Sequence, residues 1–164
     1  MKPFFICLAL LVAFQLPARQ KKPAPVVMPT SRSFQADCSK IWTPAIQAIV
    51  RHQFTPTLVD KDSGTAAFQF SGGEVRGFDV SHTMQIWAVK PKGWLAIWSA
   101  FRIGGATMSA KPEGQSCKVS LSLDMSGFES NVQKAWIKLR TNGALESSIF
   151  DEVMATVREA SANR

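Results

Sequence analysis

Residues 117–125 constrain the fold more than any other part of this sequence, because apolar and polar side chains alternate there without a break. The apolar positions are Cys117, Val119, Leu121, Leu123 and Met125. The polar positions between them are Lys118, Ser120, Ser122 and Asp124. A period of two places these groups on opposite faces of a β-strand. The segment therefore predicts a strand with one face on the core and the other in water.

An amphipathic helix is predicted on each side of the strand-forming region. The first helix is predicted over 39–53, from an apolar stripe at helical spacing: Trp42, Ala45, Ile46 and Ile49. Pro44 favours a start near Thr43, or a first helical turn that is distorted there. The second helix is predicted over 143–160, with Asn142 as its N-cap and an apolar stripe along one side.

Between these helices, four further segments have the alternation or the flanking turns of strands: 57–60, 65–71, 78–89 and 94–103. Residues 135–140 fit either a strand or a helical turn. A helix, about five strands and a second helix predict the α+β class. We expect an antiparallel sheet with an N-terminal helix and a long C-terminal helix packed on it.

The N-terminus has the pattern of a secretory signal. An unbroken apolar run over 4–14 is too short for a membrane span, which needs about 20 residues. We expect a signal peptide over 1–18, the alternative being a retained N-terminal anchor. Residues 19–36 are basic and rich in proline, which predicts a linker ahead of a single domain over 37–164.

The formal net charge is +7, and the partner that it suggests depends on whether the protein is exported. A basic cytosolic protein would suggest nucleic acid, which is not expected here. A basic exported protein fits an envelope protein or an anionic envelope surface, such as phospholipid headgroups or acidic glycans. The alternative is that the charge serves solubility alone. No transmembrane span is expected in the mature chain.

Export would remove Cys7 and leave one pair of cysteines, Cys38 and Cys117. An even pair in an oxidising compartment predicts a disulfide, and closing a ring of about 80 residues stabilises a fold by roughly 4 kcal/mol. The alternative is a metal site with His52 and His82, but their spacing matches no zinc motif. We expect neither a metal nor another cofactor.

The strands at 78–89 and 94–103 are expected to pair as a hairpin, and its register gathers tryptophans on one face. Tryptophan provides a large contact area and one N–H donor, and two cations lie nearby. This candidate partner-binding set is Trp87, Trp94, Trp98, Arg102 and Lys92. The alternative is that a helix or the linker covers this face.

Catalytic motifs are missing from the sequence. It contains neither a Gly-x-Ser-x-Gly elbow nor a His-Glu-x-x-His motif, and the glycines over 72–77 lack the Gly-Lys-Ser/Thr ending of a phosphate-binding loop. We therefore expect a protein that is not an enzyme.

The stretch Trp136-x-x-Leu139-x-Thr141-Asn142-Gly143-x-Leu145-Glu146 and the helix–strands–helix order resemble small bacterial envelope proteins of the BamC-like, helix-grip kind. The resemblance implies an accessory or scaffold domain in outer-membrane assembly and assigns no functional residue.

Together these features predict an exported, non-catalytic binding or accessory domain of the bacterial cell envelope. Its partner would contact the aromatic and basic face of the sheet. The alternative function is a carrier that holds a small apolar ligand between the sheet and the C-terminal helix. A carrier would need an apolar cavity of about 300 Å³ or more.

Overall fold

The structure is a computed structural model that describes residues 27–91 and 95–162. The expected signal peptide and the first part of the expected linker lie outside the described residues, as do Lys92 and Trp94. The described elements, in chain order, are β1 (Ser31–Phe34), α1 (Cys38–Arg51), β2 (Phe54–Asp60), β3 (Thr65–Phe70), β4 (Glu74–Arg76), α2 (Val80–Trp87), β5 (Ala88–Val89), β6 (Trp98–Glu113), β7 (Ser116–Glu129), β8 (Ala135–Thr141) and α3 (Ala144–Ala162).

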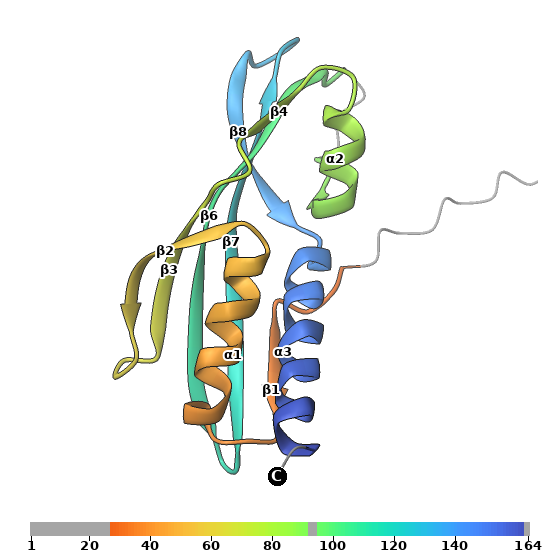
Figure 1. The fold of residues 1–164 in the computed structure, drawn as a ribbon. Coiled ribbons are helices and arrows are strands. Elements are labelled where there is room, and N and C mark those ends of the chain that lie inside the picture. Colours follow the sequence, from red (N-terminus) through yellow and green to blue (C-terminus); the bar gives the residue numbers. More distant parts are fainter. Residues whose placement is uncertain (1–26, 92–94, 163–164) are drawn as a thin grey trace, which may run out of the picture.

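A long antiparallel hairpin of β6 and β7 forms the centre of the sheet (Figure 1). In the half nearer the β6–β7 turn, called here the proximal half, β6 also pairs with β3 and β7 with β1. In the other half, the distal half, β6 pairs with β4 and β7 with β8. β2 extends the sheet beyond β3, and β5 extends it beyond β8. All of these pairings are antiparallel.

The α+β class, the antiparallel sheet and the C-terminal helix are confirmed, but the described residues form eight strands rather than about five. The additional strands are mostly short. β1, β4 and β5 have four, three and two residues. Segments of this length are too short to show an alternation of their own, so their pairing partners define them.

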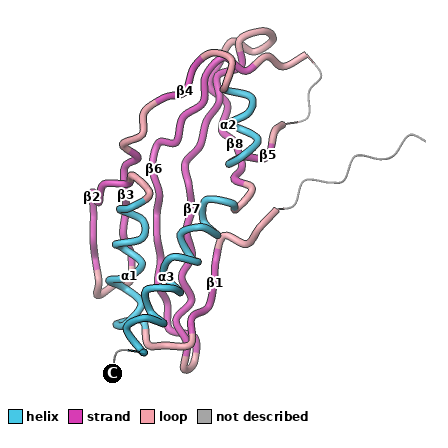
Figure 2. Tube along the Cα trace, turned by 45° about the vertical axis from the view of Figure 1, so that its right-hand side comes forward, coloured by secondary structure: helices cyan, strands magenta, loops and turns pink. Residues whose placement is uncertain are grey.

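β7 has the two faces that its alternation predicts. All five apolar positions between 117 and 125 are buried, whereas Lys118, Ser122 and Asp124 are exposed. α1 and α3 lie side by side over the buried face in the proximal half, and α2 packs on β6 in the distal half (Figures 1 and 2). The opposite face, called here the open face, carries the polar side chains.

The two long helices begin close to their predicted starts. α1 begins at Cys38, where the Asp37 carbonyl accepts hydrogen bonds from the N–H groups of Lys40 and Ile41. Pro44 therefore lies inside α1 and not at its start, and the helix lacks one hydrogen bond there. α3 is capped as predicted, because Asn142 Oδ1 accepts a hydrogen bond from the Ala144 N–H at 3.0 Å.

Residues 78–89 do not form the predicted strand. Val80–Trp87 is helical, and only Ala88–Val89 is extended, paired with β8. Val80 and Met84 are four residues apart, a helical spacing that competes with the alternation over 84–88. The helix buries both side chains completely against the sheet. The predicted hairpin with the following strand, and the tryptophan register that it implied, are therefore wrong.

Part of the expected linker is also structured. Ser31–Phe34 forms β1, which pairs with 117–120 of β7, and Phe34 is buried. Its ring meets the ring of Phe150 of α3 edge-on, with the centroids 6.3 Å apart. Because β1 covers the proximal edge of β7, this segment belongs to the sheet.

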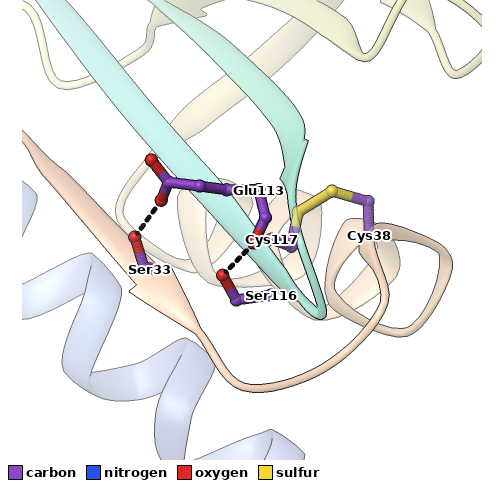
Figure 3. Close-up of a disulfide and its surroundings, with 5 residues drawn as sticks. All are labelled: Ser33, Cys38, Glu113, Ser116 and Cys117. Atoms are coloured by element: carbon purple, nitrogen blue, oxygen red, sulfur yellow. Dashed lines mark hydrogen bonds between the residues drawn. A yellow bond between two sulfur atoms is a disulfide. The ribbon is translucent and has the colours of Figure 1, made fainter.

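The predicted disulfide joins the first residue of α1 to β7 (Figure 3). The Cα atoms of Cys38 and Cys117 are 4.9 Å apart. Hydrogen bonds surround it at this end of the sheet: Ser33 Oγ donates to the Glu113 carboxylate at 2.8 Å, and Ser116 Oγ to the Glu113 carbonyl at 2.7 Å. The proximal end is thus held by one covalent link and several polar contacts.

Candidate interaction surface

The structure separates the residues of the predicted tryptophan face. Trp87 is half-buried on α2 and lines a small cleft with His52, Phe70 and Leu145. Trp98 is only 6% exposed and belongs to the core. Arg102 is the one described member of the set that is exposed on the open face. The candidate surface must therefore be built from the neighbours of Arg102.

Two rows of side chains cross the open face of the distal half. In one row, Phe128 of β7 lies opposite Trp136 of β8. In the next row, Arg102 of β6 lies opposite Ser126, which lies opposite Lys138. Directly opposed residues of antiparallel strands point to the same face. These five residues, Arg102, Ser126, Phe128, Trp136 and Lys138, are called here the open-face patch.

Arg102 is held in place by two contacts within the open-face patch. Its guanidinium carbon lies 4.0 Å from the centroid of the Trp136 ring, a cation–π contact. Its Nε donates a hydrogen bond to Ser126 Oγ at 3.0 Å. Phe128 supports the indole from the side, with ring centroids 5.7 Å apart in an edge-on arrangement. The guanidinium is therefore oriented before any partner arrives.

The two terminal nitrogens of Arg102 remain open to a partner. Within the part of the chain that the structure describes, Arg102 forms no salt bridge and donates only from Nε. A planar guanidinium with two parallel N–H groups matches a carboxylate or a phosphate. The geometry thus fits recognition of an oxyanion carried by a larger molecule.

Charges around the open-face patch favour an anionic partner. Lys138 and Arg140 alternate on β8 with buried or half-buried residues and are exposed. Lys138 Nζ is 4.0 Å from Asp124 Oδ1, and both side chains are well exposed, so this ion pair is weak. Arg76 of β4 contacts Glu74 at 2.6 Å. Four cations, including Arg102, therefore face two carboxylates.

Sequence reasoning does not identify Trp136 as a site residue, because 135–140 fits either a strand or a helical turn. Interpreted as a strand, the segment alternates strictly, with Trp136, Lys138 and Arg140 on one side and Ile137 and Leu139 on the other. That alternation alone would have placed a tryptophan and two cations on the open face. The signal was present but shorter than the one in β7.

Glu129 holds the β7–β8 turn, which joins the two strands that carry most of the open-face patch. Its buried carboxylate accepts hydrogen bonds from the backbone N–H groups of Gln133, Val132, Asn131 and Ile97. These bonds, that from Gln133 most strongly, lower the pKa of Glu129 from 4.5 to about 2. The carboxylate thus joins the turn to the segment that leads into β6.

Replacing Glu129 with glutamine is expected to destabilise the fold at neutral pH and to remove part of its sensitivity to acid. Because the pKa of Glu129 is lower in the folded state, its contribution is complete above about pH 4.5 and is lost as the pH falls toward 2. Urea midpoints of the wild type and Glu129→Gln should therefore differ at pH 7 and converge near pH 2. The exposed Glu159→Gln is the control. A difference in urea midpoint that stays the same from pH 7 to pH 2 would contradict the lowered pKa of Glu129.

Glu146 is the other buried carboxyl group in the described residues. It lies in the first turn of α3, and its Oε2 accepts a hydrogen bond from Thr141 Oγ1 at 2.9 Å. Burial raises the pKa of Glu146. Thr141 Oγ1 also accepts from the Gly143 N–H, so the group helps to fix the start of α3. Glu146 is thus hydrogen-bonded to Thr141, the residue that also holds the start of α3.

The interface predicted for a carried ligand, between the sheet and α3, is filled by protein side chains. Ile149, Phe150 and Val153 of α3 are buried there. A groove of about 640 Å³ lies instead at the C-terminal end of α3, where Phe34, Met154 and Val157 contribute apolar lining. Its position is at the edge of the core and not within it.

None of the described helices is long and apolar enough to cross a membrane. Over the same described ranges, no three histidine, cysteine or acidic side chains gather as a metal site would require. A comparison of the whole sequence with protein-family models and with curated proteins found no match.

Proposed function

We propose that this chain is an exported, non-catalytic binding domain of the bacterial cell envelope, and that it holds an anionic partner on the open-face patch. The observation that carries the proposal is the oriented guanidinium of Arg102, fixed by Trp136 and Ser126 with its terminal nitrogens free. The Cys38–Cys117 disulfide supports export, because disulfides form and persist in oxidising compartments. The cations along β8 support the choice of an anionic partner.

Replacing Arg102 with alanine is expected to weaken binding of anionic probes about tenfold or more, since charge-assisted hydrogen bonds carry the contact. The probes are a hexa-aspartate peptide and an oligogalacturonate, titrated calorimetrically at low salt. Arg102→Lys keeps the charge but loses the two parallel donors. Its affinity for each probe should therefore lie between that of the wild type and that of Arg102→Ala.

Lys61→Ala removes an exposed cation from the β2–β3 turn and is the matched control for charge. It should bind both probes as the wild type does. The proposal would be overturned if the wild type bound neither probe. It would also be overturned if Arg102→Ala and Lys61→Ala had equal affinities for the probes.

A second candidate function, carriage of a small apolar ligand, is favoured by the groove beside Phe34, Met154 and Val157. This groove exceeds the roughly 300 Å³ that a small ligand requires. Native mass spectrometry of the exported protein distinguishes the two functions. A carrier should retain a bound apolar molecule that Val157→Glu releases, whereas a protein without a retained molecule speaks against carriage.

A further inference from the structure

The distal end of the molecule exposes large apolar side chains on three separate segments. Phe78, between β4 and α2, is fully exposed at 107%, and Val132, in the β7–β8 turn, is 63% exposed. Ile97 and Leu95, which precede β6, are 58% and 48% exposed. Single exposed apolar residues are ordinary, but a group of them at one end marks an interaction site. These four residues are called here the apolar tip.

Hydrogen bonds bring the three segments of the apolar tip together. Ser130 N–H donates to the Ile97 carbonyl at 2.8 Å, and Asn131 Nδ2 donates to the Leu95 carbonyl at 2.9 Å. Gly77 N–H donates to the Ser99 carbonyl at 3.4 Å. In Figures 1 and 2 the β7–β8 turn and the β4–α2 loop lie at the same end of the sheet, opposite the C-terminus.

The side chains behind the apolar tip change character in an ordered way. The first row of the open-face patch is aromatic, Phe128 opposite Trp136, and the second is basic, Arg102 and Lys138. Two residues along a strand span about 7 Å, so the rows differ in depth by about that distance. Apolar, then tryptophan, then cation is the order of groups that a bilayer surface accommodates, from the acyl chains through the membrane–water interface to the phosphates.

Charge places the electrostatic attraction in the basic row and not at the apolar tip. Near the tip, Arg76 is paired with Glu74 at 2.6 Å, which offsets this cation. The four side chains of the apolar tip are themselves uncharged, which suits insertion among lipid headgroups. The whole chain has a net charge of +7, and loss of Lys2 with the expected signal peptide leaves +6, which adds attraction toward an anionic membrane at longer range.

We propose that the anionic partner is a phospholipid bilayer, into whose surface the apolar tip inserts while Arg102 and Lys138 contact lipid phosphates. The proposal rests on the proposed function for the role of the open-face patch, but insertion of the tip is a separate claim. Trp136 then lies at the level of the headgroups, where its ring and N–H are both accommodated. The domain would stand on its distal end, with the disulfide end away from the membrane.

Sedimentation with lipid vesicles tests the proposal on the protein purified after export. Vesicles of phosphatidylcholine with about one third phosphatidylglycerol should bind the wild type and should bind the double variant Phe78→Ser/Val132→Ser about tenfold less, because inserted apolar area is lost. Leu58→Ser is the matched control, since Leu58 is 60% exposed on the edge strand β2, whose only strand partner in the described residues is β3. It should bind as the wild type does.

The variants separate failure of this proposal from failure of the proposed function. If Arg102→Ala loses binding to the acidic probes and the double tip variant still binds vesicles fully, insertion is overturned and the proposed function stands. If the tip variant loses vesicle binding and Arg102→Ala binds the acidic probes normally, insertion stands and the proposed function fails. Absence of wild-type binding to the anionic vesicles overturns the membrane proposal.

Discussion

Replacing Trp98 with alanine is expected to lower the free energy of unfolding by about 3–5 kcal/mol, the range for truncating a large buried aromatic side chain. Trp98 begins β6 and is 6% exposed. Its ring lies against Gly127 of β7, where an added Cβ would come within 2.8 Å of Trp98 Cε3 and 3.3 Å of Leu139 Cδ1. The missing side chain of Gly127 therefore makes room for the indole, and Trp98→Ala would leave a cavity there.

Trp136→Ala is the matched comparison, because the same residue type is removed from the open-face patch. Trp136 is half-buried and contacts Arg102 and Phe128, so we expect a loss of roughly 1 kcal/mol. Urea denaturation followed by circular dichroism measures both changes. Equal midpoints for the two variants would show that Trp98 does not fill the core as described.

Removing the disulfide is the second change with a large expected effect. The double variant Cys38→Ser/Cys117→Ser should lose about 4 kcal/mol, because the bond closes a loop between residues 79 positions apart and so restricts the unfolded chain. The folded structure should persist, since α1 also buries Ile41, Trp42 and Ala45 in the core.

Urea denaturation of the double variant, alongside the wild type with and without reducing agent, measures this effect. The reduced wild type should match the double variant in its midpoint. Two free thiols in protein purified after export, or a midpoint unchanged by reduction, would contradict the disulfide.

The sequence predicts those elements whose pattern has a single interpretation. The alternation of β7 is long and strict, and Leu121 and Ser122 lie on the faces that it predicts. α3 combines a long apolar stripe with the Asn142 cap. In both elements local pattern and tertiary packing agree, so the prediction from sequence is sufficient.

Ambiguous periods account for what sequence reasoning did not predict. Around Met84 the spacing to Val80 fits a helix and the spacing to Ile86 and Ala88 fits a strand, and only packing on β6 decides between them. The predicted strand placed Trp87 on the sheet beside Trp98, whereas Trp87 ends α2 and Trp98 is buried in β6. Whether Arg102 is exposed or covered does not follow from the sequence, and its aromatic partner Trp136 comes from a segment that fits either a strand or a helical turn.

β6 and β7 run through both halves of the molecule, and their outer partners change between the halves. β6 pairs with β3 through residues 105–109 and with β4 through residues 100–102. A bulge between Ile103 and Gly105 separates these two stretches of β6. The covalent link lies at the proximal end, whereas the open-face patch and apolar tip lie at the distal one. Loops at the distal extremity can therefore vary in sequence, and so in what they recognise, without altering the residues that form the covalent link at the other extremity.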